Sequence, residues 1–225
     1  MEYIQKILGL SQVPHFTTLQ KFLCRIKSLS LRVTFRKTVN LFYPKDDVIP
    51  VTAIDSSGFT SGYCSHYFSE RTGKLRKHFL KTSISVDTDQ QAITGFISSN
   101  SRVHDIRHAR KLLRQCHNLL PSDCYVMDRG YDSDDIHRLI RQDLNADSII
   151  PPPGSGRIKS LEVRIEKEMV LKSDDPKYRR RQLVETTFSV LKRKFGSDLK
   201  ARKFLIQMKE ITSKIIVYNI HKFVL

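Results

Sequence analysis

Apolar and polar positions follow two different rhythms along the chain, and the change comes near Val48. Within residues 1–47 the chain is basic and apolar residues recur at the spacing of a helix, at Leu19, Phe22, Leu23, Ile26 and Leu29. Thr17 and Gln20 fit a capping box that would start this helix. The segment is either half of a helix-turn-helix or a packing element for the next domain. We favour packing, because no second helix with the right turn is evident.

Beyond Val48 the pattern changes to short apolar runs bounded by turn residues, which is typical of strands. The runs are VIPVTAID, which ends on Asp55, then HYFSE, KHFLKTSISVD and AITGFISS, with a turn at residues 71–74. After a helical stretch at 104–120 come the strand CYVMD, which ends on Asp128, the helix DIHRLIRQDL and the strand DSIIPPP. A meander followed by strands that alternate with helices predicts an α/β fold, in which a mixed sheet is flanked by helices.

Two helices are predicted to close the chain, at residues 178–196 and 207–223, after a polar stretch at 154–177 that we interpret as a mobile loop or small insertion. The first of them has an apolar face at Val184, Phe188, Leu191 and Phe195. Its other face carries residues within a sector of roughly 60°, namely Tyr178, Arg181, Glu185 and Lys192. An acid between two cations suggests a positive partner such as a metal ion. The alternative is an ordinary surface helix, in which Glu185 pairs with Arg181 four residues earlier.

Asp55 and Asp128 share a context, because each ends a predicted strand and precedes turn-forming residues. Taken singly, each is equally well explained as a turn cap. Neighbouring strand ends in a mixed sheet can bring the two together, where a divalent cation would relieve the repulsion between ionised carboxylates. With Glu185 as a third ligand, two ions about 3.5–4 Å apart would serve in-line displacement at phosphorus.

The charge of the chain favours a polyanionic partner without naming it. The net charge is +16, and residues 157–209 hold 16 lysines and arginines against 7 acidic residues. Phosphate contacts explain such a surplus, although a generic RNA-binding protein would share it. No run of 18 apolar residues, signal peptide, CxxC pair or HExxH motif is present, so we expect a cytoplasmic protein with reduced thiols.

The order of Asp55, Asp128 and Glu185 resembles the acidic triad of DDE transposases of prokaryotic insertion sequences, whose core is ribonuclease-H-like. The spacing Tyr178-x2-Arg181-x3-Glu185-x6-Lys192 is similar to the motif around the third acid in the insertion-sequence four/five superfamily. VTAIDSSGF resembles the family segment around the first acid, and VMDRGYDS the segment around the second. SIIPP resembles the strand after the second acid, and NSRVHD a segment between the first two acids.

The resemblance implies a ribonuclease-H-like catalytic domain at residues 48–225. Transposases of this kind usually carry a longer N-terminal region that recognises the element's ends, so we expect residues 1–47 to be a remnant of such a region, in a fragment or an N-terminally shortened chain. It implies that Asp55, Asp128 and Glu185 bind two Mg²⁺ or Mn²⁺ ions. The residues implied to contact double-stranded DNA are Tyr178, Arg181 and Lys192. The implied function is metal-dependent hydrolysis at the transposon ends and strand transfer to target DNA by a homodimer, in a nucleoid-associated protein. The alternatives are a catalytically inactive transposase-derived DNA-binding protein and a plain metal-dependent nuclease.

Overall fold

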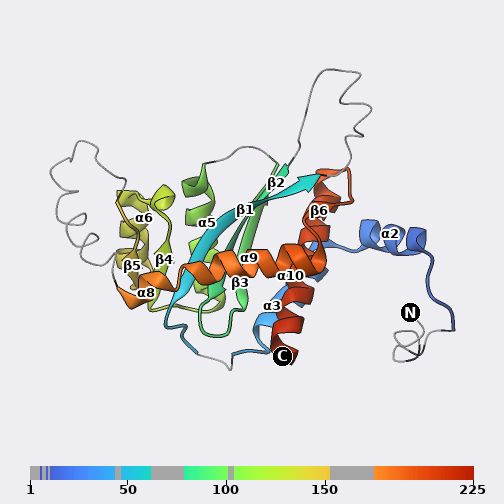
Figure 1. Cartoon of the computed structure of the whole chain (residues 1–225), viewed down its shortest axis with the longest axis horizontal. Helices are drawn as coiled ribbons and strands as arrows, with labels where there is room; N and C mark the ends of the chain where they lie inside the picture. Colours follow the sequence, from blue (N-terminus) through green and yellow to red (C-terminus); the bar gives the residue numbers. More distant parts are fainter. Residues whose placement is uncertain are drawn as a thin grey trace, which may run out of the picture.

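A mixed β-sheet forms the centre of the molecule (Figure 1). The computed structural model describes residues 6, 9, 11–43, 47–61, 79–100, 104–152 and 175–225. The strands in this part of the chain are β1 Thr52–Ser61, β2 Phe79–Asp87, β3 Ile93–Ser99, β4 Cys124–Met127, β5 Asp147–Ile149 and β6 Asp198–Leu199. Their order is β3-β2-β1-β4-β5, and β6 pairs with the far end of β1. The first three strands are antiparallel, whereas β4, β5 and β6 run parallel to their neighbours.

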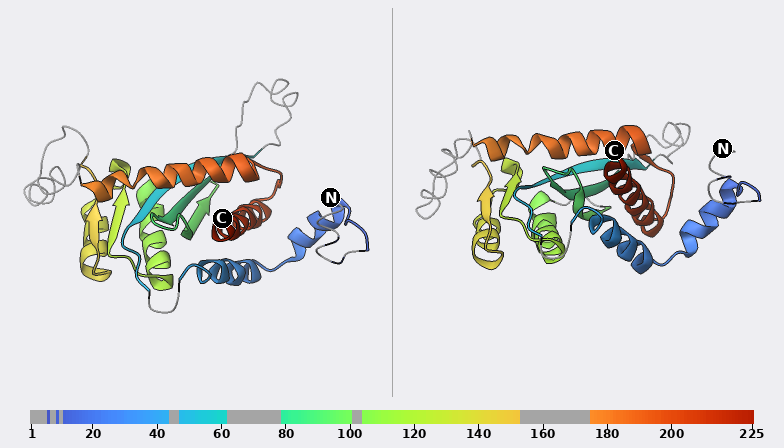
Figure 2. Two further views of the ribbon diagram at one scale, coloured as in Figure 1. Left: turned by 60° about the horizontal axis from the view of Figure 1, so that its bottom comes forward. Right: turned by 90° about the horizontal axis from the view of Figure 1, so that it is seen from below.

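Helices cover both faces of this sheet (Figure 2), which confirms the predicted α/β fold class. The longer ones are α2 Phe16–Arg25, α3 Ser28–Val39, α5 Asp105–Leu119, α9 Gln182–Phe195 and α10 Phe204–Val224. Shorter ones are the 3₁₀ helix η1 Arg129–Tyr131, α6 Asp134–Arg138, the π-helical turn η2 Leu139–Asp143 and α8 Pro176–Arg179. In Figure 2, α9 runs along one face of the sheet while α5 and α6 lie on the other. No helix among the residues described is long and apolar enough to span a membrane.

Two hydrophobic clusters, one for each face, fix the orientation of the central strand. Successive side chains of a strand point to opposite faces. Ala53 and Phe59 accordingly join the cluster beneath α9, whereas Ile54 joins the cluster beneath α5. The apolar face of α9 is buried as predicted, with Val184, Phe188 and Leu191 in the core and Phe195 packed against it. Because β1 is held from both sides, the residue at each of its positions has a defined face.

The N-terminal helices differ from the sequence-based prediction. The helix that carries the predicted apolar face begins at Phe16 with His15 as its N-cap, so the capping box predicted at Thr17 is wrong. This helix, α2, has no buried residue and stands away from the sheet in Figure 1. A second helix, α3, follows after two residues and was not predicted; it packs on the core through Leu31, Phe35 and Val39. The packing role we expected therefore belongs to α3.

Several other boundaries can be compared with the sequence. The first strand does not end at Asp55 but continues to Ser61, because β2 pairs with it along that length. The helix predicted for 178–196 is interrupted by a turn at Arg180 and Arg181, which separates α8 from α9. HYFSE, the turn at 71–74 and residues 154–174 of the predicted loop lie outside the described residues, while 175–177 begin α8.

Candidate active site

Asp55 on β1 and Asp128, directly after the neighbouring parallel strand β4, lie at the same level of the sheet. Ile54 pairs with Met127, so Asp55 is the next residue along β1 and Asp128 is the first residue after β4. Neighbouring strands lie about 4.8 Å apart, which puts the two backbones within reach of one ligand. Both side chains line one open cavity of about 430 Å³. The structure thus brings the first two predicted acids together.

The cavity forms where the sheet is locally incomplete. After Met127 the chain leaves β4 and turns into η1, and the parallel ladder with β1 stops. The next strand on that edge, β6, pairs only with Thr60 and Ser61. Among the residues described, positions 55–59 therefore have no strand partner on this side, and residues 55–58 line the cavity. A ligand that enters here reaches both carboxylates and an open strand edge.

The loop that carries Asp128 is anchored at both ends. The carboxylate of Asp128 caps η1 by accepting a hydrogen bond from the Arg129 N–H at 2.8 Å. Further along, Asp132 Oδ1 lies 3.0 Å from Nε2 of buried His137. The other ring nitrogen of His137 lies 2.8 Å from Ser148 Oγ on β5. Asp132, to which the sequence assigned no role, therefore helps to anchor this loop to β5 through His137.

Glu185 lies in the first turn of α9 but does not line the cavity. Its neighbours Val184 and Phe188 are buried against the sheet, so the glutamate faces outward with 53 % of its side chain exposed. Oε1 of Glu185 lies 2.8 Å from a guanidinium nitrogen of Arg181. The ion pair that we considered as the alternative interpretation is therefore present.

The three acids nevertheless interact through their charges. The pKa of Asp55 is raised, first because the carboxyl is buried and then because Glu185 and Asp128 are negative. A hydrogen bond from the Ser56 N–H and the charge of Arg181 oppose this rise only in part. Ionisation of Asp55 is thus less favourable than that of an exposed aspartate, and an approaching cation would favour it.

The oxygen donors of this site suit a hard divalent cation such as Mg²⁺. Asp55 and Asp128 offer carboxylate oxygens in one cavity, and the repulsion that raises the pKa of Asp55 is what a cation would relieve. In the described ranges, however, no three His, Cys, Asp or Glu side chains are close enough to hold a metal ion together. Two of the three predicted ligands therefore line one cavity, and the third is paired with Arg181.

Of the predicted DNA-contacting residues, Tyr178 lies in α8, Arg181 directly before α9 and Lys192 within α9. Tyr178 is half-buried, and its pKa is raised by burial although the nearby Arg181 charge opposes this. Lys192 Nζ donates a hydrogen bond to Ser57 Oγ at 2.7 Å and lies 5.3 Å from the centre of the Phe59 ring. Burial lowers the pKa of this lysine. The distal end of α9 is thereby attached to β1, two to four residues beyond Asp55.

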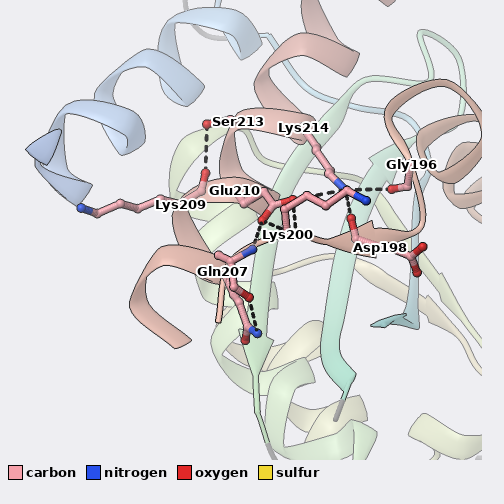
Figure 3. A network of polar contacts seen from close by, with 9 residues as sticks. Gly196, Asp198, Lys200, Gln207, Lys209, Glu210, Ser213 and Lys214 are labelled. Atoms are coloured by element: carbon pink, nitrogen blue, oxygen red, sulfur yellow. Dashed lines mark hydrogen bonds and ion pairs between the residues drawn. The ribbon is translucent and has the colours of Figure 1, made fainter. Parts of the chain in front are cut away.

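A polar network keeps the end of α9 close to the sheet (Figure 3). Lys214 of α10 donates hydrogen bonds to the carbonyl oxygens of Gly196 and Asp198, both at 2.9 Å. The Glu210 carboxylate accepts hydrogen bonds from the N–H groups of Lys200 and Ala201. Gly196, with φ of 86°, turns the chain out of α9 toward β6. The position of α9 therefore depends on α10 as well as on the core.

The opposite wall of the cavity contains residues to which the sequence assigned no role. Lys81 of β2 lies 2.7 Å from Asp105 at the start of α5, and both line the cavity. Burial favours a higher pKa for Asp105, but hydrogen bonds from Lys81 and Ser56 outweigh it, so its pKa is lowered. The signal available was the segment NSRVHD, which ends on Asp105. The tertiary pairing with Lys81 had no counterpart in the sequence.

Comparison with known proteins identifies the family of the chain. A family model described as the transposase DDE domain matches residues 46–220, which include all six strands of the sheet and the helices from α5 to most of α10. Curated proteins include no match to the chain. The matched range contains Asp55, Asp128 and Glu185 together with the basic residues of α9.

Proposed function

The chain belongs to the transposase DDE domain family, and from this premise we propose that it is the DNA transposase of a prokaryotic insertion sequence. It would hydrolyse a phosphodiester at the element's ends and join the freed 3′-hydroxyl to target DNA, acting as a homodimer on double-stranded DNA. The observation that carries the proposal is that Asp55 and Asp128 share one cavity beside the basic helix α9.

Asp55 and Asp128 would hold the metal, with Glu185 as the third ligand. Two divalent ions, Mg²⁺ or Mn²⁺, would supply Lewis acidity that activates the attacking oxygen and stabilises the leaving one. The cavity supports this role because it is open to solvent and offers carboxylate oxygens, whose mutual repulsion a cation offsets. Lys192, which donates a hydrogen bond to Ser57, would keep positive charge beside the reacting phosphate.

Arg181 would couple DNA binding to completion of the metal site. Its guanidinium lies 2.8 Å from Glu185 and close enough to Asp55 to lower that group's pKa. Two oxygens of a DNA phosphate can accept hydrogen bonds from the same guanidinium. Arg181 can therefore exchange the exposed Glu185 carboxylate for a phosphate at little cost. Once Arg181 moves to the phosphate, Glu185 is released to turn toward Asp55 and Asp128. Tyr178 next to Arg181 would stack on a base or hydrogen bond a phosphate.

A second candidate is a transposase-derived DNA-binding protein without catalysis. It is favoured by the Arg181–Glu185 pair and by the absence of a three-ligand cluster within the described ranges. Both candidates predict salt-sensitive DNA binding, because the basic residues are common to them. Only the first predicts cleavage that depends on a divalent metal.

A nicking assay on supercoiled plasmid with Mn²⁺ separates the candidates. We expect nicking by the full chain, and loss of nicking in Asp55→Asn, Asp128→Asn and Glu185→Gln, with plasmid binding retained in EDTA. Nicking that survives in all three variants, or is absent from the unmodified protein, rules out the catalytic assignment. A labelled oligonucleotide with a free 3′-hydroxyl then tests strand transfer, since a plain nuclease would cut plasmid without joining the label to it.

A further inference from the structure

A chain of hydroxyl groups links the two segments that carry Asp55 and Asp128. Ser56 Oγ lies 2.7 Å from Tyr131 Oη and 2.7 Å from Ser83 Oγ. Ser83 Oγ in turn lies 2.8 Å from Nδ1 of buried His108. Ser56 is the residue after Asp55, and Tyr131 is the third residue after Asp128. A polar route between the two acid-bearing segments therefore passes through one serine and one tyrosine.

The Ser56–Tyr131 contact lies where the backbone pairing between β1 and β4 ends. The parallel ladder between β1 and β4 ends at the Ile54–Met127 pair, so no backbone pairing continues to the aspartates. The Ser56–Tyr131 hydrogen bond lies directly beyond this pair and connects β1 to the turn η1. It approaches from the α5 face, because Ser56 and Asp55 point to opposite faces of β1. The contact can thus fix the backbone while the Asp55 carboxyl stays available on the other side.

Tyr131 is rigidly held at its own end. Only 2 % of its surface is exposed, and its ring belongs to the hydrophobic cluster beneath α5. It ends the 3₁₀ turn that Asp128 caps, so a shift of the ring would carry Asp128 with it. A rigid ring on one side and a strand-bound serine on the other give the contact a fixed length.

We propose that Tyr131 is a positioning residue whose hydroxyl, through Ser56, sets the separation of Asp55 and Asp128 at which a divalent ion binds. This inference rests on the proposed function, since it assigns how the metal ligands of that site are spaced. Tyr131 acts through other residues and would touch neither metal nor DNA. Groups that orient metal ligands in this way typically change metal affinity 10- to 100-fold when they are removed.

The variant that isolates the hydroxyl is Tyr131→Phe, which keeps the ring and its packing. Ser56 keeps its contact with Ser83, so the strand is not left with an unpaired hydroxyl. A matched control is Tyr125→Phe on β4, since Tyr125 is equally buried and its hydroxyl lies 3.3 Å from His117, but it does not line the cavity. Both variants lose one buried hydroxyl, so both should lower the midpoint of thermal unfolding to a similar small extent.

The test is a calorimetric titration of each full-length variant with Mn²⁺ alone. We expect Tyr131→Phe to weaken Mn²⁺ binding about tenfold and Tyr125→Phe to leave it unchanged. Ser56→Ala should weaken binding to a similar degree, and adding Tyr131→Phe to it should change little, because both act on one contact.

Three results would overturn the inference. Unchanged Mn²⁺ affinity in Tyr131→Phe, or an equal loss in the Tyr125→Phe control, removes the positioning role while leaving the proposed function in place. Fully additive losses from Ser56→Ala and Tyr131→Phe show that the two hydroxyls do not act through each other. If the unmodified protein binds no Mn²⁺, the proposed function fails and the inference fails with it.

Discussion

Arg181 and Glu185 are joined by an ion pair of 2.8 Å at the start of α9, beside the cavity that Asp55 and Asp128 line. The pair holds the Glu185 side chain on the surface of α9, one helical turn from Arg181. We infer that the metal site is completed only when a phosphate takes the guanidinium. Substrate binding and metal binding would then favour each other by the same factor.

Replacing Arg181 with Gln should therefore change the affinities for Mn²⁺ and for DNA in opposite directions. Without DNA, Mn²⁺ affinity should rise about three- to fivefold, because Glu185 is released and a nearby positive charge is removed. DNA affinity should fall, because a phosphate contact is lost. Arg193→Gln is the matched control, since it removes the same charge from an exposed residue of α9. The Nε of Arg193 donates a hydrogen bond to the carbonyl oxygen of Ser189 at 3.4 Å. Weaker Mn²⁺ binding in Arg181→Gln would contradict this coupling.

Lys192 should contribute one phosphate contact to DNA binding. In Lys192→Gln we expect weaker binding at every salt concentration, and a slope of log K against log salt that is smaller by about one. Fluorescence anisotropy with a labelled duplex across a range of salt measures both. Lys194→Gln serves as comparison, because Lys194 points instead to His221 of α10. Equal effects of the two variants would mean that charge alone, and not position, decides binding.

The environment of Asp55 predicts how stability depends on pH when metal is removed. Its pKa in the folded protein is raised by burial and by two nearby acids. At a pH between the ordinary and the raised pKa, the folded state therefore holds a proton that the unfolded chain has released. The free energy of unfolding falls as pH rises through this range. Asp55→Asn should be more stable than the unmodified protein at pH 7 in EDTA, with the advantage lost below a pH of about 3.9.

Urea denaturation at several pH values measures this difference. Asp143→Asn is a suitable control, because Asp143 is exposed and pairs with an exposed arginine, Arg114. An Asp55→Asn protein that is less stable than the unmodified one at neutral pH would show that the Asp55 charge is already compensated.

Much of the fold was predictable because strand and helix patterns are local. The periodicity of α9 placed Val184 and Phe188 in the core, and the apolar run before Asp128 identified β4. The end of β1 was missed because its continuation is polar and depends on pairing with β2. In the site, the spacing of the motif gave no sign of the turn at Arg180 and Arg181. Asp105 was missed because its partner Lys81 is distant in sequence, and only the folded sheet brings them together.

The edge of the sheet near α5 has little room for a larger side chain. A β-carbon at Gly95 of β3 would lie 2.8 Å from Ser85 Oγ, 3.1 Å from Leu112 Cδ1 and 3.2 Å from Cys116 Cβ. We expect Gly95→Ala to lower the free energy of unfolding by about 1–3 kcal/mol, as overpacking of a filled core usually does. Gly130→Ala is the control, since nothing lies within 4 Å of its added carbon. Equal urea midpoints for the two variants would contradict the packing described here.

The central claim, that Asp55, Asp128 and Glu185 hold divalent ions, is tested most directly by anomalous X-ray scattering from crystals grown with Mn²⁺ and a DNA duplex. We predict a manganese peak in the cavity, about 2.1 Å from carboxylate oxygens of Asp55 and Asp128, with Glu185 released from Arg181. An empty cavity at saturating Mn²⁺, with Glu185 still on Arg181 while DNA is bound, would contradict the account.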